Sequence, residues 1–173
     1  MRFLVMPAAA ALVAASACTP ANDWRELRPE GSGIVVMFPC KPDRHARTVT
    51  LAGRATRMEM LVCGVGGTTF GLSFADIDDP VAVSVAVDEL RAAAAENIGA
   101  TVVSQQEAQV PGMTPNARAV RLRLEGRRPD GTALREETAF FVRGLRVYQA
   151  TILGPAIAAD VQESFFAALR LTS

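Results

Sequence analysis

After residue 32, short apolar runs separated by turn residues predict a series of β-strands. Residues 33–38 form a continuous apolar and β-branched run that ends at Pro39, as is typical of a buried strand. Phe70, Leu72 and Phe74 alternate with smaller residues in segment 68–74, so their side chains share one face of a strand. Similar patterns predict further strands over residues 48–51, 55–62, 101–110, 117–125, 134–142 and 145–153.

Two segments have helical spacing instead. Asp79 before Pro80 predicts an N-cap followed by proline at the first helical position. The apolar residues of this helix recur every three or four positions until Gly99, namely Val83, Val87, Leu90 and Ala94. A second helix is predicted over residues 158–169, with Val161, Phe165 and Leu169 on one stripe.

These elements predict an α+β domain over residues 33–173, with an antiparallel sheet of about seven or eight strands packed by two helices. The length suits one domain with its own hydrophobic core. The formal net charge is +0, which gives no general affinity for nucleic acid or for anionic lipid.

The first eighteen residues have the pattern of an export signal. Arg2 is followed by an apolar run over residues 3–15 and by small residues up to Ala17, directly before Cys18. The run is shorter than the roughly 20 residues that span a bilayer. This segment resembles the lipobox signal of bacterial lipoproteins, although Ala15 stands where that family usually has leucine.

The resemblance implies that residues 1–17 are removed, that Cys18 is acylated, and that residues 18–32 tether the domain to a membrane. The protein would then lie in the bacterial cell envelope and face the periplasm. By resemblance to enterobacterial sorting rules, Thr19 after the cysteine favours the outer membrane over the inner one. Plain secretion after cleavage at the same point is the alternative.

Cys40 and Cys63 remain as an even pair in a chain bound for an oxidising compartment, so we predict a structural disulfide. Its loop of about two dozen residues would contribute about 3 kcal/mol in the chain-entropy model. A redox-active pair is the alternative, although neither cysteine belongs to a Cys-x-x-Cys motif.

The opening of the domain, from Gly33 to the Phe38-Pro39-x-x-Pro42 turn, and its ending around Phe165, Phe166 and Leu169 carry a second resemblance. They are similar to the PsbP-like α+β fold and to a group of uncharacterised proteobacterial lipoproteins. Cys40 departs from the glycine usual there. PsbP-like proteins are mostly assembly or accessory factors without catalysis, which implies such a role for this chain.

Few residues suggest catalysis. His45 is the only histidine and lies in a charged stretch, where we expect a solvated loop. Gly71-Leu-Ser73-Phe-Ala75 resembles a nucleophile elbow but lies in a strand pattern, and Gly64-Val-Gly66-Gly67 is typical of a hairpin turn. We therefore expect no enzymatic activity, no cofactor and no resident metal.

Two charge clusters remain. We interpret Asp76, Asp78 and Asp79 as helix-capping and helix-dipole residues rather than a calcium site. We interpret the basic cluster as cross-strand charge pairs with the Arg135-Glu136-Glu137 segment. A patch for an anionic ligand or partner is the alternative. The basic cluster consists of Arg121, Arg123, Arg127 and Arg128.

The leading hypothesis is a lipid-anchored, non-catalytic binding or accessory module whose partner is an unknown protein or small molecule. The alternative is an envelope copper or thiol-redox protein using Cys40, Cys63 and His45, because thioether, thiolate and imidazole groups bind copper. Three methionines extend that set, namely Met37, Met58 and Met60. Core packing explains Met58 and Met60 equally well.

Overall fold

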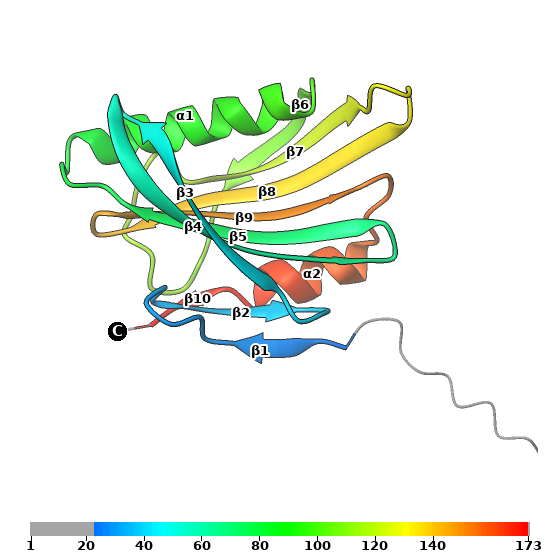
Figure 1. Cartoon of the computed structure of the whole chain (residues 1–173), viewed down its shortest axis with the longest axis horizontal. Coiled ribbons are helices and arrows are strands. Elements are labelled where there is room, and N and C mark those ends of the chain that lie inside the picture. The colour runs from blue at the N-terminus through cyan, green and yellow to red at the C-terminus, as the bar shows by residue number, and fades with distance from the viewer. Residues whose placement is uncertain (1–22, 173) are drawn as a thin grey trace, which may run out of the picture.

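The fold described here is that of a computed structural model, which describes residues 23–172. Cys18 and the predicted signal lie outside this range. The described chain forms three layers, with a large antiparallel sheet in the middle (Figure 1). One helix covers part of its upper face in this view. A second helix and a small sheet cover the lower face.

Seven strands form the large sheet, in the order β3-β4-β5-β9-β8-β7-β6, and every neighbouring pair is antiparallel. The predicted α+β class with an antiparallel sheet is therefore confirmed. The seven strands are β3 (Asp43–Leu51), β4 (Arg54–Val65), β5 (Thr68–Asp76), β6 (Thr101–Glu107), β7 (Val120–Arg127), β8 (Ala133–Arg143) and β9 (Arg146–Gly154).

Helix α1 (Ala82–Asn97) packs its apolar stripe on one face of the large sheet. The predicted core positions Val83, Val87, Leu90 and Ala94 are all buried. The helix begins two residues later than predicted, because Asp79 caps the turn before it. The Asp79 carboxylate accepts a hydrogen bond from the Val81 N–H (2.9 Å), and its carbonyl accepts one from Ala82 (3.0 Å).

The opposite face is covered by α2 (Ala159–Ala167) and by a three-stranded sheet of β1 (Arg25–Leu27), β2 (Ile34–Phe38) and β10 (Arg170–Leu171). Aromatic rings fill this layer. Phe165 of α2 makes edge contacts with Phe38 of β2 and Phe70 of β5 at 5.8 and 5.6 Å between centroids. Trp24 packs on Phe70 at 5.8 Å, as a lone tryptophan at the domain edge would.

The small sheet corrects two predictions. Residues 33–38 form a strand, but it pairs with β1 and β10 instead of joining the large sheet. The predicted tether over residues 18–32 includes β1, so the folded part begins before residue 33. Strands β1 and β10 are three and two residues long, which is too short for a sequence pattern to predict them. Each forms its hydrogen bonds with β2.

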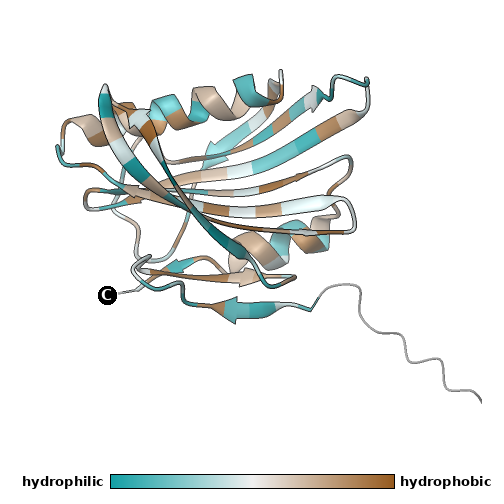
Figure 2. Ribbon diagram, viewed as in Figure 1, coloured by the Kyte–Doolittle hydropathy of each residue, from teal (hydrophilic) through white to brown (hydrophobic). Residues whose placement is uncertain are grey.

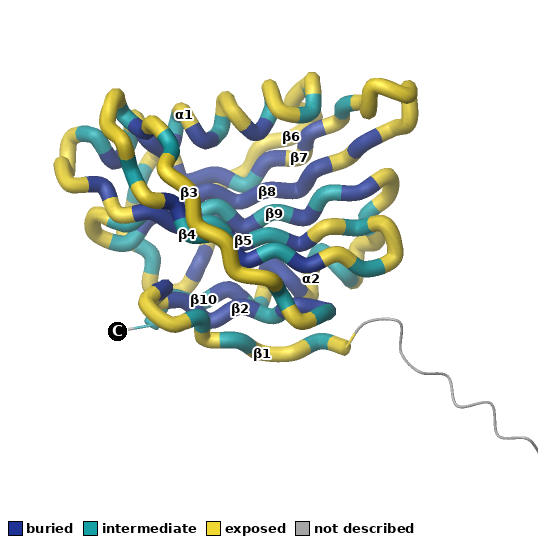
Figure 3. Tube along the Cα trace, in the orientation of Figure 1, coloured by how far each residue is buried: buried dark blue, intermediate teal, exposed yellow. Residues whose placement is uncertain are grey.

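The two edges of the large sheet are the exposed strands β3 and β6 (Figure 3). The segment around His45, predicted as a loop, pairs residue by residue with β4, and His45 lies opposite Met60. The loop prediction is wrong, while the expected solvent exposure of His45 is confirmed. Strand β6 ends at Glu107 instead of Val110, and Ala108 and Val110 after it are buried.

Candidate functional site

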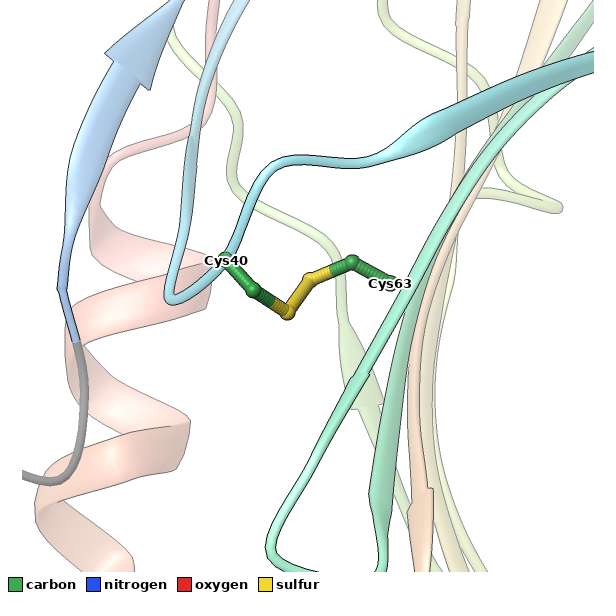
Figure 4. Close-up of a disulfide and its surroundings, with 2 residues drawn as sticks. All are labelled: Cys40 and Cys63. Atoms are coloured by element: carbon green, nitrogen blue, oxygen red, sulfur yellow. A yellow bond between two sulfur atoms is a disulfide. The ribbon is translucent and has the colours of Figure 1, made fainter.

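Cys40 and Cys63 form a disulfide, with sulfurs 2.07 Å apart and Cα atoms 6.0 Å apart (Figure 4). Cys40 follows β2 and Cys63 lies in β4, so the bond ties the small sheet to the large one. The predicted disulfide is confirmed. Both thiols are consumed by the bond, which removes them as thiolate ligands.

Of the remaining soft ligands, Met37 lies in β2 of the small sheet, and the other two methionines lie on the opposite face of the large sheet. Met58 and Met60 of β4 pack toward the α1 side, while Cys63 belongs to the core on the α2 side. Strand alternation explains this split, because side chains of odd and even positions point to opposite faces. Within residues 23–172, no group of three or more histidine, cysteine, aspartate or glutamate side chains lies close enough to hold a metal ion. The structure does not bring the copper set together.

The other candidate motifs have structural roles. Ser73 lies within β5, opposite Met60 and Gln149 on its neighbours, so its backbone is extended and makes no strand-to-helix elbow. Gly66 and Gly67 form the turn between β4 and β5, as predicted. Of the acidic cluster, Asp76 ends β5 and forms a two-point ion pair with Arg146 (2.7 Å for both oxygens), so the helix-dipole role predicted for it is wrong.

A groove of about 540 Å³ lies on the α2 face of the sheet. Side chains of α2 form one wall, and the end of β6 with the segment after it forms the other. The floor is Arg121 of β7 and Ala139 of β8, which belong to the sheet itself. The lining residues are Gln106, Glu107, Ala108, Gln109, Val110, Arg121, Ala139, Ala159, Gln162, Glu163, Phe166, Ala167 and Leu169.

Arg121 is the only basic side chain in this lining. Its guanidinium carbon lies 3.9 Å from the centre of the Phe166 ring, which is cation–π distance. Its Nε lies 3.4 Å from the Glu137 carboxylate, within ion-pair range, but has no hydrogen-bond partner among residues 23–172. Burial lowers the pKa of Arg121 from its ordinary value, against the opposing effect of the Glu137 charge.

Glu137 of β8 lies between two arginines and is 4% exposed. Its carboxylate accepts a hydrogen bond from the Arg123 Nε (2.5 Å) and is the ion-pair partner of Arg121. Arg135 and Glu125 form a second cross-strand pair at 3.2 Å. The predicted charge pairing is confirmed for Arg121 and Arg123 with Glu137. Arg127 instead donates to the Gly131 carbonyl in the turn that follows β7 (3.0 Å).

Glu136 contradicts the predicted charge pairing. It points to the α1 face, where its register neighbours are Leu124 and Leu153, and it is 5% exposed. Within residues 23–172, no hydrogen bond or neighbouring charge lowers the pKa of its carboxyl group. Burial alone raises its pKa from 4.5 to about 7. Figure 2 shows the hydrophilic stretch inside β8 that holds both glutamates.

No protein-family model matches the chain, and no curated protein matches it. No helix within residues 23–172 is both long and apolar enough to cross a bilayer. The sequence predicted that Arg121 belongs to a charge cluster, but it did not predict the groove. Arg121 and Phe166 are far apart in the sequence and come into contact only in the folded chain.

Proposed function

We propose that this chain is a lipid-anchored protein of the bacterial cell envelope that faces the periplasm and binds a ligand without chemical conversion. The anchor would be the acylated Cys18, at the outer rather than the inner membrane. Support comes from the export pattern of residues 1–17 and from the Cys40–Cys63 disulfide. Disulfides persist in oxidising compartments such as the bacterial periplasm.

The observation that carries the binding role is the groove between α2 and the sheet. Its volume lies within the range of small-molecule sites, and it combines apolar side chains such as Ala139 and Leu169 with a few polar groups. Its polar groups are the guanidinium of Arg121, three glutamine amides and the Glu163 carboxylate. Guanidinium and amide groups suit recognition by hydrogen bonding. The proposed role is therefore binding, in keeping with an accessory module.

The anchoring part is tested by changing Cys18→Ser. Acyl chains contribute about 0.8 kcal/mol per buried methylene, so their loss should move the protein from the membrane fraction to the soluble periplasmic fraction. Alkaline washing and detergent partitioning of both proteins measure this. Membrane fractionation of the variant equal to that of the wild type would refute the lipid anchor.

The binding part is tested by filling the groove. Ala167 lines the groove on the exposed surface of α2, so Ala167→Trp should occupy part of it without changing the core. Ala93→Trp on the exposed surface of α1 is the matched control. Native mass spectrometry of protein purified from the envelope should find a bound small molecule on the wild type and the control, and less on Ala167→Trp. Equal ligand occupancy in all three would place binding elsewhere.

A further inference from the structure

We propose that the groove takes a small ligand with one free carboxylate, and that the Arg121 guanidinium binds this carboxylate. The inference rests on the proposed binding role of the groove and adds the chemical class of its ligand. The Arg121 side chain lies at the floor of the groove, against the ring of Phe166.

Arg121 has hydrogen-bonding capacity that the protein does not use. A guanidinium carries five N–H donors and accepts nothing. The Nε of Arg121 is buried without a hydrogen-bond partner in residues 23–172, and in the same range neither terminal nitrogen donates a hydrogen bond. The side chain is 23% exposed and only its Nε is fully buried, so a ligand in the groove can reach the terminal nitrogens. A planar, two-oxygen acceptor such as a carboxylate matches a guanidinium in geometry and charge.

The neighbouring arginines lack this free capacity. Arg123 donates to Glu137 at 2.5 Å, and Arg135 pairs with Glu125 at 3.2 Å. Both are also about half exposed, so water can satisfy their other donors. Arg121 and Arg123 share the one Glu137 carboxylate, which leaves this trio with a net charge of +1. An incoming carboxylate would neutralise that charge.

The other lining residues limit the size, polarity and charge of the rest of the ligand. Apolar atoms of Val110, Ala139 and Leu169 can pack against a short aliphatic group. The side-chain NH2 of Gln162 donates to the Ile157 carbonyl (3.1 Å), so its carbonyl oxygen can accept a hydrogen bond from a ligand N–H. Glu163 belongs to the same lining, so a second negative charge on the ligand would meet its carboxylate. The ligand class is therefore a monocarboxylate with a small apolar body, and dicarboxylates and phosphates are disfavoured.

The test is a titration of the full chain carrying Cys18→Ser, followed by NMR of the arginine side-chain Nε–Hε groups. The probes are N-acetyl-leucine, its primary amide and N-acetyl-glutamate, which differ in the number of carboxylates. We expect a saturable shift of the Arg121 resonance with N-acetyl-leucine and at least about tenfold weaker binding of the amide, because a charged hydrogen-bond pair is lost. We expect N-acetyl-glutamate to bind more weakly than N-acetyl-leucine.

Arg121→Gln should weaken the binding of N-acetyl-leucine about tenfold or more, and Arg121→Lys should restore part of it. Both variants leave Glu137 paired with Arg123, so the fold should survive, which the melting temperature checks. Arg135→Gln on the same face is the control and should bind like the wild type.

Equal binding of the acid and the amide would overturn the inference, as would unchanged binding by Arg121→Gln or no saturable shift up to roughly tens of millimolar. If these results occurred while Ala167→Trp still displaced the native ligand, the proposed binding role would stand and only the ligand class would fail.

Discussion

Glu136 and Glu137 are adjacent in β8 and almost equally buried, yet their side chains have different surroundings on the two faces of the sheet. On the α2 face, Glu137 lies between Arg121 and Arg123. On the α1 face, Glu136 lies between Leu124 and Leu153, and its pKa rises to about 7. A buried carboxyl group is tolerated either by pairing its charge or by losing it. The paired face is the one that holds the groove.

The largest effect should come from removing both partners of Glu137. In an Arg121→Ala, Arg123→Ala double variant the Glu137 carboxylate is left buried without an ion-pair partner. We expect the free energy of unfolding to fall by about 4 kcal/mol, within the range for broken buried pairs. Urea denaturation at pH 7 measures it. Adding Glu137→Gln should recover part of the loss, and the absence of any recovery would show that lost packing causes the effect.

Breaking the disulfide should loosen the α2 face selectively. Cys40→Ala with Cys63→Ala removes a cross-link with a sequence separation of 23, which costs about 3 kcal/mol in the chain-entropy model. Because Glu136 lies on the other face, the pH dependence of stability that it causes should persist in this variant. Denaturation curves at several pH values check both points. Loss of that pH dependence would mean that the two faces are not independent.

Glu136 should make the protein less stable as the pH rises. Its pKa is 4.5 unfolded and about 7 folded, so the folded state holds the proton more tightly. Its favourable effect is complete below pH 4.5 and is lost as the pH rises through 7, by about 3 kcal/mol in all. In Glu136→Gln this part of the pH dependence should disappear. Equal slopes of stability against pH in both proteins, measured between pH 5 and 8, would contradict the assignment.

The smallest effect is expected at His45. This histidine lies on the same face of the sheet as Glu136 but on the exposed edge strand β3. Exposed surface positions without special contacts change stability by less than about 0.5 kcal/mol. His45→Ala should therefore leave the melting temperature and ligand binding unchanged. A loss of binding with an intact fold would point instead to the metal hypothesis.

The sequence predicted what depends on local pattern and missed what depends on distant contacts. Strand alternation and helical spacing located both helices and most strands of the large sheet, and cysteine counting found the disulfide. The small sheet was missed because residues 25–27, 34–38 and 170–171 come together only in the folded chain.

The same limit applies to the site. Period-two alternation separates Glu136 from Glu137, but only the register with Leu124 and Leu153 explains why Glu136 is buried and unpaired. The charge pairs of Arg121 and Arg123 could be predicted from neighbouring strands of a hairpin. The contact of Arg121 with Phe166 could not, since α2 reaches it from the end of the chain.

The most direct test of the central claim is a crystal structure of the Cys18→Ser protein soaked with N-acetyl-leucine. We expect the ligand carboxylate in the groove beside α2, with its oxygens about 2.7–2.9 Å from nitrogens of Arg121. The leucine side chain should lie against the apolar side chains of Ala139 and Leu169. A ligand bound elsewhere, or an empty groove at saturating ligand, would contradict the claim that Arg121 is the carboxylate-binding group.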